Sequence, residues 1–211
     1  MLNLLTRYRR LLKGVDTWFG ECCSRYGEQI TCHQGCSACC RGLFEISLLD
    51  ARLLQEGFNL LPAGIRNTCL RKATSRRDEL TDLWPGFVHP YILNRLPHAD
   101  WQEMPEDDQT PCPLLGPDGS CLVYAYRPMT CRLHGLPHVD DSGEVFADDW
   151  CTLNFKETDP LSLSEIRHPF RQLFTEEFDL LGQFATDLFG HPLLELDTFI
   201  PTALLIDFDR L

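Results

Sequence analysis

Long hydrophobic runs are missing from this sequence of 211 residues. Apolar runs such as the one at 203–206 are short, whereas a helix that spans a membrane needs about 20 consecutive apolar residues. The opening segment carries its arginines behind its first leucines and has no long apolar stretch, so it lacks the pattern of a secretory signal. We therefore expect a cytoplasmic protein with no segment inside a membrane.

Positive charge is scarce as well. The chain has 19 Lys and Arg against 31 Asp and Glu, a formal net charge of −12 at pH 7, and a surface of this sign repels nucleic acid and anionic lipid. Several enzyme motifs are also missing: there is no glycine-rich phosphate loop, no His-Glu-x-x-His and no Gly-x-Ser-x-Gly. The sequence thus predicts no nucleic-acid partner and none of these three enzyme types.

Cysteine, by contrast, is abundant, with 11 residues in 211. An odd number of cysteines and an expected reducing compartment argue against a disulfide framework. Cysteines at this density in a cytosolic protein are more often metal ligands or redox groups. The hydrophobic fraction of 44% and the charged fraction of 24% are those of an ordinary globular protein and exclude a disordered chain.

Hydrophobic periodicity and capping signals predict four long helices. Their apolar residues recur at steps of three and four, the spacing of one helix face. The segments are 4–26, 48–60, 63–83 and 163–189. Ser47 and Ser162 each begin a capping box at the start of a predicted helix. Five basic residues of the third helix are interpreted as a solvated face: Arg66, Arg71, Lys72, Arg76 and Arg77.

Prolines mark a different kind of segment in the middle of the chain. Nine of the 14 prolines fall at 85–137, where irregular chain is therefore expected. The tail at 193–211 is expected to form a short helix or strand. We predict a single, mainly α-helical domain over 1–211, in which an irregular cysteine-rich metal-binding lobe at about 30–151 packs against a helical core. The flanking helices lie within 1–29 and 160–211.

Eight of the cysteines fall into two groups. The first group has the pattern C-x3-C-x2-C-C and consists of Cys32, Cys36, Cys39 and Cys40. The second group is more widely spaced and consists of Cys112, Cys121, Cys131 and Cys151. Two thiolates can hold one metal only if the chain between them turns within a few residues, and Gly35 permits such a turn. Because thiolates select zinc, iron–sulfur clusters or cuprous copper, these eight residues are candidate metal ligands.

The division of the eight thiols is left open: they could fill two four-thiolate sites, or one cluster with several spare thiols. The side chains of the neighbours Cys39 and Cys40 diverge, so a single shared ion would be strained and a polynuclear centre suits them better. We therefore favour an iron–sulfur cluster over zinc. We also expect at least one ligand set to join the 32–40 segment to the 112–131 segment, which would order the proline-rich stretch.

Other residues near the two groups have more than one interpretation. Cys22 and Cys69 lie on apolar helix stripes, which favours buried core positions, and Cys23 has no assigned role. Arg127 and Arg132 flank Cys131 and either donate to sulfur or pair with an acidic residue. Three histidines adjoin candidate ligands and could each replace a thiolate, although a polar surface position is their commoner role: His33, His134 and His138.

The two cysteine motifs resemble those of a known family. The first is Cys-His-Gln-Gly-Cys-Ser-Ala-Cys-Cys at 32–40, followed by Ile-Ser-Leu at 46–48. The second comprises Cys-Pro-Leu-Leu at 112–115, Gly-Ser-Cys-Leu-Val-Tyr at 119–124 and Arg-Pro-Met-Thr-Cys-Arg at 127–132. In this order the motifs resemble the YkgJ-type cysteine-cluster family, described as a zinc- or iron-chelating domain.

The resemblance covers about residues 30–151 and implies a bound metal ion or iron–sulfur cluster with a redox or structural role. Carried over to this sequence, it implies the ligands of the two groups above, with Cys151 as the less certain eighth. It implies no known reaction. A flagellin lysine N-methylase is similar to the family in its cysteine pattern, so the alternative is a group-transfer enzyme that uses the metal centre. No catalytic residue is assigned, and a protein partner remains open.

One further enzyme class shares part of the first motif. The spacing of Cys32, Cys36 and Cys39 matches that of radical S-adenosylmethionine enzymes, whose three cysteines leave one iron open. Ala38 stands where those enzymes usually have an aromatic residue, and the sequence shows no alternating series of strands and helices. The motif alone is therefore weak support for radical chemistry.

Overall fold

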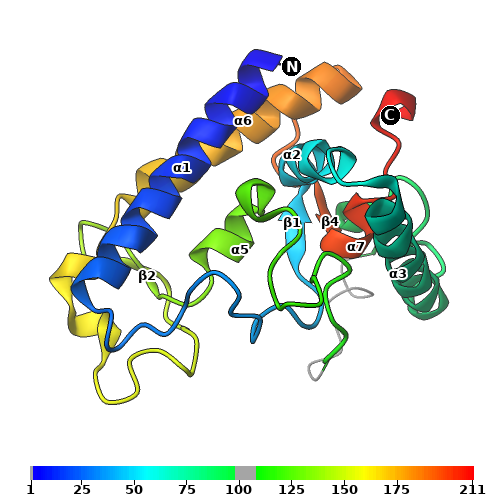
Figure 1. Ribbon diagram of the computed structural model, residues 1–211. Coiled ribbons are helices and arrows are strands. Elements are labelled where there is room, and N and C mark those ends of the chain that lie inside the picture. The colour runs from blue at the N-terminus through cyan, green and yellow to red at the C-terminus, as the bar shows by residue number, and fades with distance from the viewer. Residues whose placement is uncertain (1, 98–107) are drawn as a thin grey trace.

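The computed structural model describes residues 2–97 and 108–211. Over these residues the protein is mainly α-helical, as predicted (Figure 1). Their six α-helices are α1 (Leu2–Arg25), α2 (Leu48–Asn59), α3 (Ala63–Leu83), α5 (Met129–Leu133), α6 (Phe170–Phe189) and α7 (Ile200–Ala203). No helix within these two ranges has both the length and the apolar character needed to cross a membrane.

Short strands form two antiparallel pairs. The pairs are β1 (Glu45–Ser47) with β4 (Asp197–Phe199), and β2 (His138–Val139) with β3 (Val145–Ala147). Because β1 leads directly into α2 and β4 leads directly into α7, the first pair brings the C-terminal segment back beside α2 and α3 (Figure 1). Five 3-10 turns complete the described elements: Leu93–Arg95, Tyr124–Tyr126, Pro160–Ser162, Ser164–Ile166 and Phe208–Arg210.

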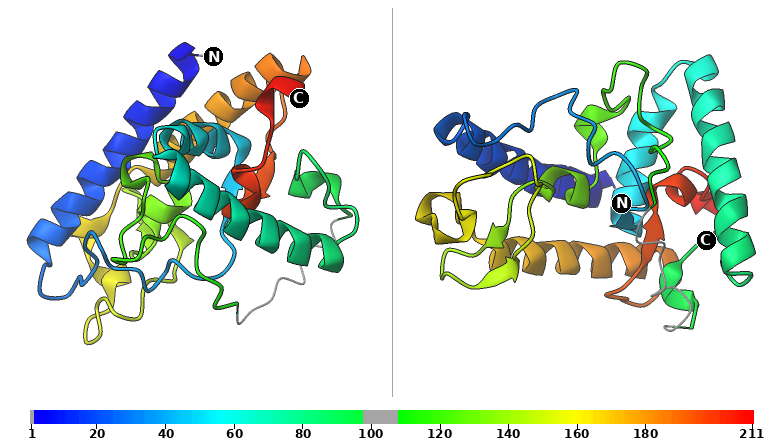
Figure 2. Two further views of the ribbon diagram at one scale, coloured as in Figure 1. Left: turned by 45° about the vertical axis from the view of Figure 1, so that its right-hand side comes forward. Right: turned by 90° about the horizontal axis from the view of Figure 1, so that it is seen from below.

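The first helix runs along α6, far from it in the sequence but beside it in space (Figures 1 and 2). The buried face of α1 follows the predicted apolar stripe, in which Tyr8 and Val15 are fully enclosed. The steps of three and four in the sequence predict a stripe of Leu4, Tyr8, Leu11, Val15, Trp18 and Cys22. One position differs: Leu12 is buried, whereas Leu11 is half-buried and packs at the edge of the core. The stripe was therefore predicted correctly to within one residue.

The start of α2 confirms the predicted cap. The Ser47 hydroxyl accepts a hydrogen bond from the Asp50 amide at 3.1 Å, which satisfies one of the free amides of the first turn. The Asp50 carboxylate does not complete a capping box with Ser47. It is buried and instead accepts hydrogen bonds from other parts of the chain.

The start of α6 corrects the prediction. The helix begins at Phe170, not at residue 163, and the segment before it forms two 3-10 turns. Pro169 immediately precedes the helix, and a proline disfavours the α conformation of the residue before it. The capping signal at Ser162 is therefore followed by a 3-10 turn and not by a long helix. From Phe170 onward the predicted aromatic stripe is largely buried, although Phe178 is half exposed.

The two cysteine motifs lie side by side, as predicted. The Cys112 amide donates to the Cys40 carbonyl at 2.9 Å, and the Gly42 amide donates to the Thr110 carbonyl at 2.9 Å. Around these contacts the chain is mostly irregular, and α5 and the short turns are the regular elements of the described part of 85–137. The predicted proline-rich segment also includes residues 98–107, which lie outside the described residues.

Candidate metal centre

Six of the eight candidate cysteines line one cavity of about 80 Å³, which we call the cysteine cavity. They are Cys36, Cys39, Cys40, Cys112, Cys121 and Cys131. They come from three places: the 36–40 loop, the loops around 112 and 121, and the helix α5. Residues that lie almost a hundred positions apart in the sequence thus face a common space. The two motifs thus contribute six cysteines to the lining of one cavity, and their role as metal ligands stays a prediction.

Two glycines allow the cysteine loops to approach each other. Gly35 and Gly119 have φ values of 96° and 81°, which favour glycine because a Cβ atom is strained there. A Cβ atom added to Gly119 would lie 3.0 Å from the Gly35 carbonyl oxygen. Within the first motif, the Cys36 amide donates to the His33 carbonyl and the Cys40 amide to the Ser37 carbonyl, each at 3.0 Å. These turns bring Cys36, Cys39 and Cys40 to the wall of the same cavity.

The sixth thiol is held by α5. Pro128 precedes the first residue of this short helix, where its missing N–H costs no hydrogen bond. The next residue, Met129, donates its amide to the Asp50 carboxylate at 3.1 Å. Cys131 follows on the same helix turn and is half-buried against the core. Its position is therefore fixed from α2 through a buried carboxylate.

Burial and mutual repulsion keep most of these thiols protonated. Burial raises the pKa of Cys112 to about 12, and it also raises the pKa values of Cys121 and Cys131. The Cys39 thiol donates a hydrogen bond to Cys40, which raises the pKa of Cys39 and lowers the pKa of Cys40. The two side chains therefore meet, and the expectation that they diverge was wrong. Cys40 ionises before Cys39, Cys112, Cys121 and Cys131, and charging these four requires a compensating cation.

The two arginines beside Cys131 both pair with Asp16, so the ion-pair interpretation holds for each of them. Arg132 also donates to the carbonyls of Ala125 and Arg127. Arg127 lines the cysteine cavity, and its guanidinium stacks over the Tyr124 ring with 3.8 Å between its carbon and the ring centroid. Arg127 thus places a positive charge at the cavity wall, where it favours thiolate over thiol.

Cys32 and Cys151 lie outside the cysteine cavity. The Asn154 side-chain amide donates to the Cys32 sulfur at 3.2 Å and to the Gly135 carbonyl at 2.8 Å. A Cβ atom on Gly135, whose φ is 114°, would lie 3.0 Å from the Cys32 sulfur. Burial raises the pKa of Cys32 to about 11, and a nearby Cys151 thiolate adds to that effect. The two cysteines are therefore near each other but not brought into the group of six.

The sequence did not single out Asn154, which is buried and contacts the first motif from a distance of more than a hundred residues. An asparagine three residues after a cysteine resembles any loop asparagine, so only the folded structure identifies it. Of the histidines, His33 and His134 line the cysteine cavity, whereas His138 packs against Phe170 with 5.1 Å between ring centroids. Burial lowers the pKa of His134, which leaves its ring neutral at pH 7.

The remaining cysteines are in the core. Cys22 and Cys69 are each 2% exposed on their helices, which confirms their predicted burial. Cys23 is half-buried on α1. Across 2–97 and 108–211, no group of three or more His, Cys, Asp or Glu side chains is arranged so that it could hold a metal ion. The six thiols of the cysteine cavity therefore share a space without forming a finished ligand set.

Comparisons with known proteins identify no relative of this chain. No family model, no curated protein and no solved structure matches this chain. The resemblance to the YkgJ-type family therefore stays a prediction that rests on the two cysteine motifs.

Proposed function

We propose that this protein holds an iron–sulfur cluster or a zinc ion in the cysteine cavity. The observation that supports the proposal is the gathering of six thiols from distant segments around one space of about 80 Å³. Buried cysteines in an ordinary core are scattered among apolar side chains, as Cys22 and Cys69 are. Six that line one cavity together with an arginine are better explained by a shared ligand.

The donor set fits a thiophilic metal. Thiolate sulfur selects zinc, iron–sulfur clusters or cuprous copper over hard cations such as magnesium and calcium. Within the described residues no three of the thiols are arranged to hold an ion as they stand, so binding would rotate their side chains toward the centre. Their raised pKa values mean that binding would also release protons.

The size of the cysteine cavity favours an inorganic occupant. Cavities for organic ligands hold roughly 300–1,000 Å³, several times the volume here. A structural zinc site and a common iron–sulfur cluster each use four cysteines, so the six thiols supply one complete set and two others. Because the neighbours Cys39 and Cys40 both face this space, we favour a polynuclear centre over a single ion.

The residues proposed as ligands are therefore drawn from the six of the cysteine cavity, with His33 and His134 as possible replacements. Cys32 and Cys151 belong to the motifs but would need to move to join them. When bound, an iron–sulfur cluster would supply one-electron transfer, and zinc would supply a crosslink between the loops. Arg127 would partly balance the negative charge of either centre.

Metal analysis together with a visible spectrum tests the proposal. Protein purified without oxygen is compared with its Cys36→Ser variant and with Cys23→Ser, a control that alters a half-buried cysteine outside the cavity. We expect bound iron with a brown spectrum, or bound zinc without colour, in wild type and in Cys23→Ser. Cys36→Ser should lose most of the metal. Equal metal content in all three proteins, or none in wild type, would contradict the proposal.

The alternative of a group-transfer enzyme has one observation in its favour. A larger cavity of about 450 Å³ shares Cys112 with the cysteine cavity and has the volume of a substrate site. Activity of this kind requires a second organic molecule to bind next to the metal centre. Transfer of a methyl group from a labelled donor to a protein substrate, lost in Cys36→Ser, would support it. Electron transfer without methyl transfer would exclude it.

A further inference from the structure

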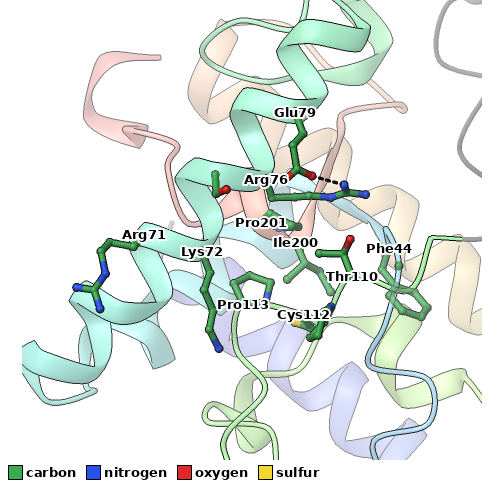
Figure 3. Close-up of a pocket in the computed structure, with 13 residues that line it drawn as sticks. Phe44, Arg71, Lys72, Arg76, Glu79, Thr110, Cys112, Pro113, Ile200 and Pro201 are labelled. Atoms are coloured by element: carbon green, nitrogen blue, oxygen red, sulfur yellow. Dashed lines mark hydrogen bonds and ion pairs between the residues drawn. The ribbon is translucent and has the colours of Figure 1, made fainter.

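A second cavity adjoins the cysteine cavity, and we call it the basic cavity. Its volume is about 450 Å³, within the range of cavities that hold small organic molecules. It shares Phe44, Cys112 and Ile200 with the cysteine cavity, so the two are separated by a few side chains. Its other walls come from α3, from the segment at 110–113 and from α7 (Figure 3).

The polar groups of the basic cavity lie mostly on α3. Arg76 pairs with Glu79 and with Asp108, so its charge is already balanced. Arg71 donates to Thr68, and in Figure 3 its side chain points away from Pro113. Lys72 extends toward Pro113 instead. Its ammonium has no hydrogen-bond or ion-pair partner in the part of the chain that the structure describes.

Lys72 also lies near the cysteine cavity. Lys72 and Cys112 line the basic cavity together, and Cys112 also lines the cysteine cavity. An anion that binds Lys72 would lie between the α3 wall and Cys112.

Lys72 supplies the unpaired positive charge of this wall. The basic cavity is lined by three of the 19 basic residues of the chain and by Glu79, and Arg76 is already paired with Glu79 and Asp108. In a protein of net charge −12, the Lys72 ammonium attracts anions that the rest of the surface repels. The predicted solvated face of this helix is thus partly the wall of a cavity.

The remaining walls of the basic cavity suit an apolar body. Pro113, Ile200 and Pro201 line it, and the hydroxyls of Ser75 and Thr110 add neutral hydrogen-bonding groups. Small-molecule sites typically combine a mostly apolar lining with a few polar groups that fix orientation. Lysine is a common partner of phosphate and carboxylate groups, which it binds as a point charge.

We propose that the basic cavity binds a small organic anion, whose phosphate or carboxylate group pairs with Lys72 and whose apolar body lies against Pro113 and Ile200. This site is distinct from the thiols of the cysteine cavity, and it does not depend on which metal they hold. Cys112 is the side chain through which the two sites touch.

Titration calorimetry of the purified full chain with three probes tests the site. Phenyl phosphate carries both the anion and an apolar ring, inorganic phosphate carries the anion alone, and benzyl alcohol carries the ring alone. We expect phenyl phosphate to bind to one site per chain and more tightly than either of the other probes. Two variants address the walls: Lys72→Met removes the charge, and Ser75→Phe fills the space. Both positions are exposed on α3, so neither change disturbs the core.

Matched controls are Lys156→Met and Ser24→Phe, at exposed positions outside the basic cavity. We expect Lys72→Met to weaken phenyl phosphate binding about tenfold, which corresponds to about 1.4 kcal/mol. Ser75→Phe should abolish binding, while the controls should bind as wild type does. The proposal is overturned if phenyl phosphate does not bind, if the two lysine variants bind alike, or if inorganic phosphate and phenyl phosphate bind equally.

Discussion

The Asp50 carboxylate accepts a hydrogen bond from the Met129 amide at 3.1 Å, which joins α2 to the start of α5. It also accepts one from the Tyr8 hydroxyl of α1 at 2.8 Å. The same hydroxyl lies 3.2 Å from the Glu177 carboxylate of α6. A single buried acid thus connects three helices of the core to the helix that carries Cys131, and it provides the first prediction.

Asp50→Ala should destabilise the protein markedly. The substitution leaves the Tyr8 hydroxyl with Glu177 as its remaining partner and leaves the Met129 amide unpaired in a buried place. An unsatisfied buried donor costs about 1–3 kcal/mol, so we expect a loss of about 2–4 kcal/mol in the free energy of unfolding. Urea denaturation measures it, with the exposed Asp82→Ala on α3 as control. Equal stability of the two variants would show that Asp50 does not hold α5.

The second prediction concerns pH. Burial raises the pKa of Asp50 to about 7 and that of Glu177 to about 8, because it disfavours the charged forms. Between the ordinary pKa values and these raised ones, the folded protein binds more protons than the unfolded chain. The contribution of the two groups to the free energy of unfolding therefore falls as the pH rises, and it levels off above about pH 8.

Glu177→Gln removes one of these titrations. Between about pH 5 and pH 8 the stability of the variant should rise relative to wild type by at least about 1 kcal/mol, or about 2–4 °C in Tm. Taking the difference between the two proteins cancels the histidines, which titrate in both. Thermal unfolding at a series of pH values measures it, preferably on metal-free protein, since metal binding has its own pH dependence. A constant difference would contradict the raised pKa.

How far the sequence predicts the fold depends on which interactions determine each element. The bounds of α2 and α3 were predicted to within a residue, because periodicity and the Ser47 cap are local signals. The start of α6 was wrong because Pro169 outweighed the capping pattern before it. The capping pattern at Ser162 favours a helix start and Pro169 opposes one, and the sequence alone does not show which of the two prevails.

Some features of the candidate site were likewise predictable from the sequence, and others depend on the folded structure. The two motifs predicted that the 32–40 and 112–131 segments meet, since short cysteine spacings carry that information in the chain itself. The sequence did not assign Asn154 to the cysteine motifs or Lys72 to the basic cavity. Each acts through contacts made only after helices and loops have packed, and neither has a neighbour in sequence that marks it. The exclusion of Cys32 and Cys151 from the cysteine cavity likewise depends on how Gly135 and Asn154 pack.

The third prediction concerns removal of the metal. Under the proposed function, the centre crosslinks loops more than seventy residues apart in the chain, and the second of these loops lies in the proline-rich segment. Structural zinc contributes on the order of 10–16 kcal/mol in small peptides, compared with about 5–15 for a whole domain. A chelator should therefore lower the Tm and increase proteolysis within 32–44 and 108–137. Protection that is unchanged after complete metal loss would show that packing alone orders these loops.

Asn154→Leu should weaken the first cysteine motif and alter the reactivity of Cys32. The Asn154 side chain accepts from the Thr31 amide at 2.9 Å and donates to the Cys32 sulfur and to the buried Gly135 carbonyl, so a leucine of similar size leaves these groups without their partner. We expect a loss of about 2–4 kcal/mol in the free energy of unfolding.

The hydrogen bond from Asn154 lowers the pKa of Cys32 against the larger effect of burial. Without it, Cys32 should be alkylated more slowly at a given pH in metal-free protein, as peptide mapping would measure, with the exposed Asn67→Leu as control. Faster alkylation would instead indicate local opening of the loop.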